Sequence, residues 1–224
     1  DRSRIMLEKR EGLTQDDLAG SRAAYDAAIA YLDSELARLF RALDRRGLTD
    51  RTIIIVTSDH GEFLGEHGLM LHGNALYQEV LHVPLVVLFP PCVPEATRLA
   101  PLVSLRDTPA TILELALREP SAPLPGRSLS RFWQGDAAAP AGAEPVLAHV
   151  TPGEFLEPWE PAAFHTLFAV FQDSLHLIRR SDGQTELYDF VRDPRAAHDL
   201  AASHPDAAQR LLQRLDSLRS NDRR

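Results

Sequence analysis

Residues 52–73 read TIIIVTSDHGEFLGEHGLMLHG, an uncharged apolar run followed at once by a polar, glycine-rich segment. The run at 52–57 is rich in β-branched residues, which is typical of a strand buried on both faces of a parallel sheet. Ligands of open α/β sheets bind beyond the carboxyl ends of the strands, so Asp59 and His60 lie where chemistry is expected. A carboxylate beside an imidazole suits a divalent metal next to an anionic substrate.

The segment after this strand is rich in histidine. Four of the nine histidines fall within 23 residues, at His60, His67, His72 and His82. Glycines interrupt the segment, which therefore predicts a loop that folds back on itself rather than a helix face. Paired cysteines are absent, so the pattern is not that of a zinc finger. The alternative is a glycine-rich connection with surface histidines, which the histidine density directly after a buried strand disfavours.

A long helix is predicted before the strand. Thr14-Gln15-Asp16-Asp17 is typical of a capping box, and Arg45-Arg46-Gly47 is typical of a helix end. Between them, apolar residues recur at spacings of four and three: Tyr25, Ile29, Leu32, Leu36, Leu39 and Leu43. We expect this stripe to cover a sheet and to be core. Helix, short loop and strand then form one step of a doubly wound fold.

The rest of the chain predicts further strands and two helices. A second strand is expected at 85–89, and Thr108 is expected to cap a helix that has Pro109 at its first position. Residues 118–145 are rich in Pro, Gly and Ala and predict a surface excursion. Four alternating stretches at 145–150, 165–172, 174–180 and 185–190 predict strands, with a hairpin turn at Ser181-Asp182-Gly183. A polar helix at about 204–218 follows.

Several motifs occur in one order between about residues 14 and 200. The polar segment continues into Leu76-Tyr77-Gln78-Glu79 and Val83-Pro84-Leu85. The later motifs are Val103-Ser104-Leu105-Arg106-Asp107-Thr108-Pro109-Ala110-Thr111-Ile112-Leu113, Leu124-Pro125-Gly126-Arg127-Ser128-Leu129, Glu186-Leu187-Tyr188-Asp189, Asp193-Pro194 and Asp199-Leu200. This ordered set resembles the second metal-binding block and the downstream motifs of the sulfatases, a family of the alkaline-phosphatase superfamily.

The resemblance implies an α/β fold, namely an alkaline-phosphatase-like three-layer αβα fragment with a small C-terminal antiparallel sheet plus helix. It implies that residues 1–135 are the C-terminal part of the catalytic α/β domain and that 136–224 form a small α+β subdomain. The activity it implies is metal-dependent hydrolysis of sulfuric esters, with a small anionic ester as substrate.

The resemblance also implies roles for single residues. Asp59 and His60 match the ligands of one divalent metal ion, for which the family favours Ca, while the imidazole leaves Mn, Mg and Zn open. His72 lies thirteen residues after Asp59 and matches the position of a residue that binds the ester or protonates its leaving oxygen. We therefore expect His72 to be catalytic and substrate-binding, and His67 to be a weaker substrate-binding candidate. Glu62 and Glu66 are expected to brace the loop through backbone amides, with a metal-ligand role as the alternative for each.

The family's nucleophile motif, C-x-P-x-R or S-x-P-x-R, has no match in the chain, and neither does its N-terminal pair of acidic metal ligands. Cys92-Val93-Pro94-Glu95-Ala96 contains C-x-P, but alanine stands where arginine belongs and the order of motifs is wrong. We therefore expect a C-terminal half of a larger enzyme, inactive alone, whose missing N-terminal half is its partner. That half is expected to carry a formylglycine nucleophile, with serine or threonine as the alternative.

Two alternatives remain open at this point. One is another activity of the superfamily, such as a phosphonate or phosphodiester hydrolase or a phosphoethanolamine transferase; the other is a non-catalytic remnant. The net charge of −8 disfavours nucleic acid as a partner. No apolar run approaches the ~20 residues of a membrane span. The compartment stays open, with bacterial cytoplasm and a periplasmic or secreted location both compatible with the sequence.

Overall fold

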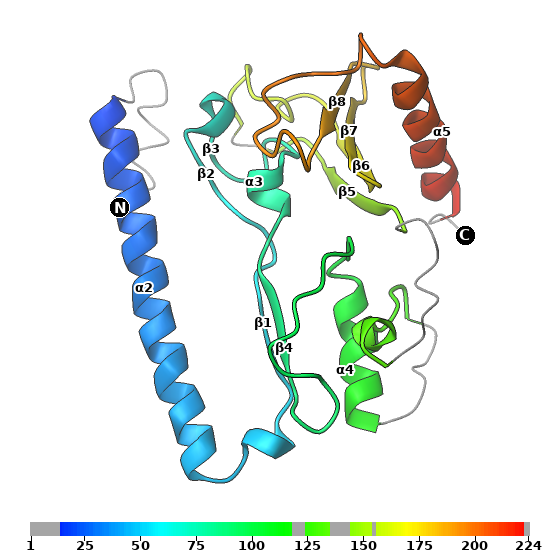
Figure 1. The fold of residues 1–224 in the computed structure, drawn as a ribbon. Coiled ribbons are helices and arrows are strands. Elements are labelled where there is room, and N and C mark those ends of the chain that lie inside the picture. Colours follow the sequence, from blue (N-terminus) through cyan, green and yellow to red (C-terminus); the bar gives the residue numbers. More distant parts are fainter. Residues whose placement is uncertain (1–13, 118–123, 135–143, 154–155, 222–224) are drawn as a thin grey trace. The chain divides into compact units, whose positions relative to one another are not determined.

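The computed structural model describes residues 14–117, 124–134, 144–153 and 156–221. Helices and antiparallel sheets make up this part of the chain, so the predicted α/β class is confirmed (Figure 1). Two compact units are present. The first comprises Asp1–Thr52 and Phe63–Leu71, and the second comprises Ile53–Glu62 and His72–Arg224.

The first unit is built on the long helix α2 (Gln15–Arg45). Thr14 caps it as predicted, because its side chain accepts from the Asp17 backbone N–H while the Asp17 carboxylate accepts from the Thr14 N–H. The turn η2 (Thr49–Arg51) follows, and the short strands β2 (Phe63–Leu64) and β3 (Met70–Leu71) form a hairpin around the turn η3 (Glu66–Gly68). Arg22 of α2 pairs with Glu66 at 3.1 Å.

The apolar stripe of α2 is not buried by the rest of the first unit, so the prediction that it covers a sheet is not confirmed within that unit. Tyr25, Ile29, Leu32 and Leu39 are 41–57% exposed. Within the first unit, the contacts of α2 lie with β2 and η2, which are too short to cover the middle of a 31-residue helix. The amphipathic pattern therefore fixed the helix but not its burial.

The apolar run forms β1 (Ile54–Thr57), and its partner is β4 (Leu85–Leu88). The two strands are antiparallel, with Ile55 opposite Val87. Strand β1 therefore does not join the parallel sheet that we expected. Nor is β1 buried on both faces, since its residues are half-buried and Thr57 is exposed. In the part of the chain that the structure describes, β4 is its only strand partner, which leaves the other edge of β1 without a neighbour.

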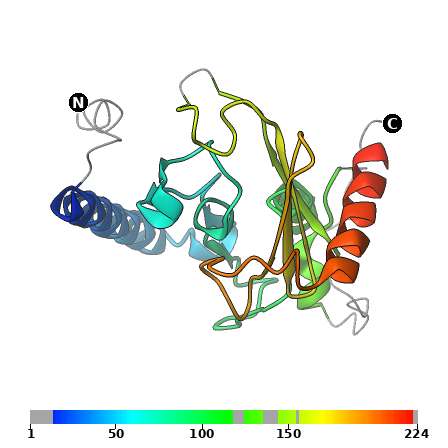
Figure 2. The ribbon, with the colours of Figure 1, turned by 90° about the horizontal axis from the view of Figure 1, so that it is seen from above.

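The C-terminal part of the second unit is the predicted antiparallel sheet plus helix. Its strands β5 (Val146–Val150), β6 (Leu167–Gln172), β7 (Leu175–Arg180) and β8 (Thr185–Asp189) pair in sequence order. The hairpin turn at Ser181-Asp182-Gly183 is confirmed, with Gly183 at a φ of 98°. Helix α5 (Pro205–Asn221) runs along one face of this sheet (Figure 2) and packs Leu211 and Leu215 against it.

The other face of this sheet contacts the segment that follows the polar loop. There, the short helix α3 (Gln78–Leu81) is preceded by Tyr77, whose hydroxyl donates to Glu186 at 3.0 Å. Tyr188 donates to the same carboxylate oxygen at 2.7 Å. Burial and the adjacent Glu186 charge raise the pKa of both tyrosines well above the usual value, so both hydroxyls remain donors. The Glu186-Leu187-Tyr188-Asp189 motif is thus structural.

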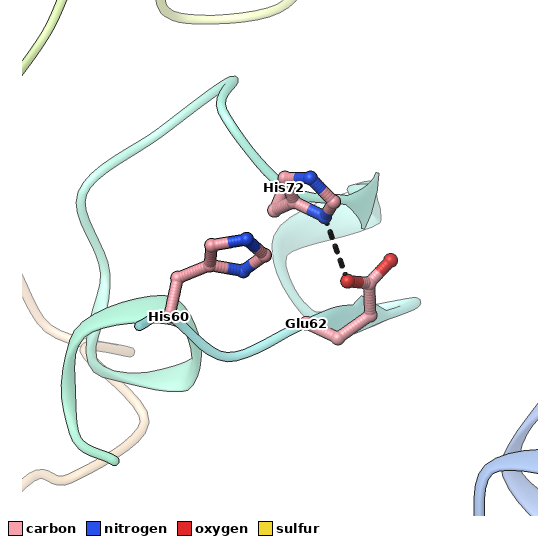
Figure 3. A group of neighbouring side chains, drawn as sticks. All are labelled: His60, Glu62 and His72. Carbon is pink, nitrogen blue, oxygen red and sulfur yellow. Dashed lines mark hydrogen bonds and ion pairs between the residues drawn. The ribbon is translucent and has the colours of Figure 1, made fainter. Parts of the chain in front are cut away.

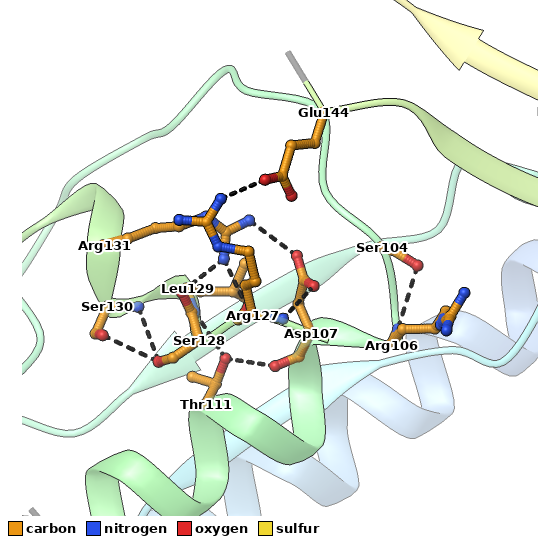
Figure 4. A network of polar contacts seen from close by, with 10 residues as sticks. All are labelled: Ser104, Arg106, Asp107, Thr111, Arg127, Ser128, Leu129, Ser130, Arg131 and Glu144. Carbon is orange, nitrogen blue, oxygen red and sulfur yellow. Dashed lines mark hydrogen bonds and ion pairs between the residues drawn. The ribbon is translucent and has the colours of Figure 1, made fainter. Parts of the chain in front are cut away.

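Two further motifs meet at the start of helix α4 (Asp107–Leu117), which begins one residue before the predicted cap Thr108. Arg131, in the turn η4 (Leu129–Phe132), forms an ion pair with Asp107 at 2.9 Å, and the Arg127 backbone N–H donates to the same carboxylate (Figure 4). A Cβ on Gly126 would lie 1.8 Å from the Arg106 carbonyl oxygen, so this close approach needs glycine. Because its guanidinium is paired with Asp107, Arg131 is structural.

The predicted boundary between residues 135 and 136 lies outside the described residues, so it stays a prediction. Parts of the predicted surface excursion, 118–123 and 135–143, lie outside them as well. None of the described helices combines the length and apolar character that a membrane span requires.

Candidate metal and substrate site

The polar segment begins one residue after β1 ends, so the strand carries Asp59 and His60 at its carboxyl end. The Asp59 carboxylate is exposed and accepts a hydrogen bond from the His60 backbone N–H at 3.0 Å. This hydrogen bond holds the pKa of Asp59 below its usual range, and the nearby imidazole adds to the effect. Asp59 is therefore ionised at neutral pH, as a metal ligand must be.

The imidazole of His60 is oriented by its own loop. Nδ1 lies 2.9 Å from the Gly61 carbonyl oxygen, which accepts a hydrogen bond and thereby places the ring proton on Nδ1. The lone pair is then on Nε2, which lies 3.6 Å from Asp59 Oδ2. A carbonyl that accepts from the non-ligating nitrogen is the usual support of a metal-binding histidine. The donor set of Asp59 and His60 therefore fits a divalent cation.

Gly61 fixes the position of this pair within the second unit. Its backbone N–H donates to the Val80 carbonyl in α3 at 2.9 Å. A Cβ built at this position would lie 1.9 Å from the Glu79 carbonyl oxygen, far inside any real contact. Only glycine lets the two backbone segments approach this closely.

His72 lies beside His60, which the spacing in the sequence did not predict. The ring centroids are 4.0 Å apart, and His72 Nδ1 lies 2.8 Å from Glu62 Oε2 (Figure 3). One ligand atom from each of His60, Glu62 and His72 lies within 4.8 Å of the others. The expected catalytic histidine and the expected metal-binding histidine thus belong to one cluster.

Glu62 is the residue for which the sequence favoured a bracing role and left a metal-ligand role only as the alternative. We expected it to bind backbone amides, but its carboxylate pairs with His72. The signal is visible once β2 and β3 are paired. Phe63 is opposite Leu71, and Glu62 and His72 are the residues that flank this pair.

The remaining residues of the loop lie in the first unit. Glu66 accepts from the Leu64 backbone N–H at 2.6 Å, which confirms its bracing role. His67 adopts a left-handed backbone with φ of 54°, and its ring contacts Phe63 edge-on at 6.3 Å. A role of His67 in substrate binding stays a prediction.

The fold is of the alkaline-phosphatase-like class, as its similarity to solved structures shows. A 2-O GAG sulfatase superposes with a TM-score of 0.82 at 17% identity, over 97% of this chain and 46% of that one. The phosphonate monoester hydrolase of Agrobacterium radiobacter superposes with a TM-score of 0.76 at 26% identity, over 94% and 43%.

The chain belongs to the sulfatase family, whose family model matches residues 6–117, half of its length. Arylsulfatase K of Bos taurus is 29% identical over 92% of this chain and 38% of its own length. The choline-sulfatase of Rhizobium meliloti is 32% identical over 88% and 37%. The chain thus spans less than two fifths of these relatives.

Proposed function

We propose that the protein containing this chain is a metal-dependent hydrolase of sulfuric esters, with Asp59 and His60 as metal ligands. The observation that carries the proposal is the Asp59–His60 pair, which follows β1 within the stretch that the sulfatase family model matches. The names of the relatives, arylsulfatase K and choline-sulfatase, point in the same direction. The substrate is a small anionic ester.

The bound divalent metal would offset the negative charge of the ester oxygens and lower the pKa of the attacking group. Asp59 contributes a carboxylate that is already ionised, and His60 contributes a nitrogen whose lone pair is already exposed. Calcium is the expected ion from the family, while the imidazole keeps manganese, magnesium and zinc open.

His72 is proposed to act on the leaving oxygen of the ester. Its Nδ1–H donates to Glu62, which holds the ring and leaves Nε2 facing the substrate, to which it would donate as the imidazolium. We propose further that a formylglycine nucleophile is supplied by a part of the protein outside these 224 residues, because they contain no C-x-P-x-R or S-x-P-x-R motif.

The test uses the enzyme that contains this chain and measures metal content and turnover together. Asp59→Asn and His60→Ala are each expected to reduce bound metal and sulfate ester hydrolysis by at least about 10–100-fold, the loss that outer-shell partners alone produce. His82→Ala is the control, because this histidine is exposed in the same segment. Normal metal stoichiometry by elemental analysis in both ligand variants would overturn the assignment.

A phosphonate ester hydrolase is the second candidate, and the structural similarity to the Agrobacterium radiobacter enzyme favours it. The kcat/KM values for a nitrophenyl sulfate and for the matching phosphonate monoester separate the two. A larger value for the sulfate supports the first proposal, whereas a larger value for the phosphonate supports the second. No turnover of either ester would favour a non-catalytic remnant.

A further inference from the structure

A second set of ligand atoms lies beside the Asp59–His60 pair. His60, Glu62 and His72 each offer one such atom, and these atoms lie within 4.8 Å of one another. Two imidazoles and one carboxylate are a set that zinc uses in proteins, with water completing the coordination. We propose that His60, Glu62 and His72 form a binding site for a divalent cation of the zinc type, which shares His60 with the position that Asp59 anchors and is an alternative to it.

The backbone holds the three side chains together without help from a metal. Glu62 and His72 flank the Phe63–Leu71 pair of the β2–β3 hairpin, so they face each other across its open end. His60 is held two residues before Glu62 by the close approach of Gly61 to α3. All three ligands therefore come from one short stretch of the chain, residues 60–72.

The distances are close to those that a zinc ion requires. Bonds of about 2.0–2.2 Å in a tetrahedron place neighbouring donor atoms about 3.3 Å apart. The Glu62–His72 separation is 2.8 Å, and the other separations are at most 4.8 Å. The imidazoles of His60 and His72 are 42% and 49% exposed, so each can shift by the small distance needed and an ion can reach them from solvent.

The charge of the cluster also favours a cation. Zinc binds imidazole in its neutral form, so the set of two such rings and one carboxylate would present a net charge of −1 to the ion, and the chain as a whole carries −8. Among the described residues, no lysine or arginine forms an ion pair with Glu62. The carboxylate is half-buried and thus partly desolvated, which strengthens its attraction for an ion over that of a fully solvated group.

Zinc binding would rearrange the protons of the cluster. Without metal, His72 Nδ1–H donates to Glu62; with metal, Nδ1 presents its lone pair and the proton moves to Nε2 or is released to solvent. His60 binds through Nε2, since its Nδ1–H is used by the Gly61 carbonyl. Because His60 Nε2 binds one ion at a time, zinc here would withdraw His60 from Asp59 and His72 from the ester. This inhibitory consequence rests on the proposed function, whereas the binding itself does not.

The experiment measures metal binding by the purified chain after treatment with a chelator. Calorimetric titration with Zn²⁺ is expected to show one ion per chain, and the visible spectrum of bound Co²⁺ is expected to be that of a tetrahedral site. Glu62→Gln and His72→Ala should each weaken Zn²⁺ binding by at least about 10-fold. His82→Ala should bind as tightly as the parent. Circular dichroism checks that each variant is folded, and His72→Gln replaces His72→Ala if the latter does not fold.

Asp59→Asn separates this site from the pair described above. We expect it to leave Zn²⁺ binding within about 3-fold of the parent, because Asp59 is outside the three-residue cluster. The inference is wrong if the chain binds no Zn²⁺, or if His82→Ala weakens Zn²⁺ binding as much as His72→Ala does. It is also wrong if Asp59→Asn abolishes Zn²⁺ binding while Glu62→Gln and His72→Ala retain it. Failure of the proposed function is seen separately, as absent sulfate ester turnover in a zinc-free assay.

Discussion

At the scale of single residues, the candidate site depends on short-range contacts that set the chemical state of each side chain. The His60 N–H keeps Asp59 ionised, and the Gly61 carbonyl selects the tautomer of His60 that can bind a metal. Glu62 accepts a hydrogen bond from His72 Nδ1 and so holds the proton of that ring on Nδ1. Each contact joins residues at most ten positions apart, so these chemical states depend on local structure.

The role of His72 can be resolved by varying the leaving group of the substrate. A histidine that protonates the leaving oxygen matters most for poor leaving groups, because good ones depart without a proton. In the enzyme that contains this chain, His72→Ala should slow alkyl or sugar sulfate hydrolysis by about 10²–10⁴-fold, and nitrophenyl sulfate hydrolysis far less. Steady-state kcat/KM values for both ester types provide the measurement. Equal losses for both would remove the acid role and leave a binding role.

At the scale of elements, an ion pair between Arg131 and Asp107 joins the turn η4 to the start of α4. Arg131 and Asp107 are both largely buried, and the Arg131 guanidinium also donates to the carbonyls of Arg127 and Ser128 at 2.6 Å. Asp107 would lose its charged partner in Arg131→Ala, and a buried charge without a partner is costly.

We therefore expect Arg131→Ala to lower the free energy of unfolding by about 2–4 kcal/mol, with urea denaturation followed by circular dichroism as the measurement. Arg127→Ala is the matched control. Its side chain is exposed and pairs with Glu144, while its backbone N–H, which binds Asp107, is unchanged. It should cost no more than about 1 kcal/mol. Similar losses in both variants would show that the ion pair is not what fastens the turn.

Strand β7 contains a histidine that makes the C-terminal sheet sensitive to acid. His176 is 1% exposed, stacks on Phe171 at 3.9 Å, and its Nε2 has no hydrogen-bond partner among the described residues. Burial lowers the pKa of His176 to about 3, against about 6.5 in the unfolded chain. The folded state thus favours the neutral imidazole. The contribution of His176 to the free energy of unfolding is fully present above pH 6.5, and it is lost as the pH falls towards 3 because the unfolded chain then binds the proton.

Between pH 6.5 and 5, protonation of His176 in the unfolded chain should lower the free energy of unfolding by about 2 kcal/mol. Urea denaturation at both values measures the change. His176→Phe, which keeps an aromatic ring at the site, should show a pH dependence smaller by that amount, because the other titrating groups are unchanged. An identical pH dependence in parent and variant would contradict the assignment.

At the scale of the whole molecule, the chain contains the candidate metal pair but no match to the family's nucleophile motif. Catalytic metals usually have about three protein ligands and an open position, whereas Asp59 and His60 supply two. We expect residues 1–224 alone to show no turnover of aryl sulfate or aryl phosphonate esters with added divalent metal. Turnover that disappears in Cys92→Ala would show that Cys92 is a nucleophile after all, since it is the single cysteine of the chain.

Sequence alone determined the features that depend on neighbours along the chain. These include the capping box at Thr14, the strand before Asp59, the hairpin turn at Gly183, and the family itself, because caps, turns and motifs are fixed by residue type at short spacing. Only the tertiary structure decided that β1 pairs antiparallel with β4, that the α2 stripe is exposed, and that Glu62 and His72 meet beside His60. Strand direction, burial and side-chain clustering depend on which surfaces pack together, and the periodicity of one segment carries no information about its partner.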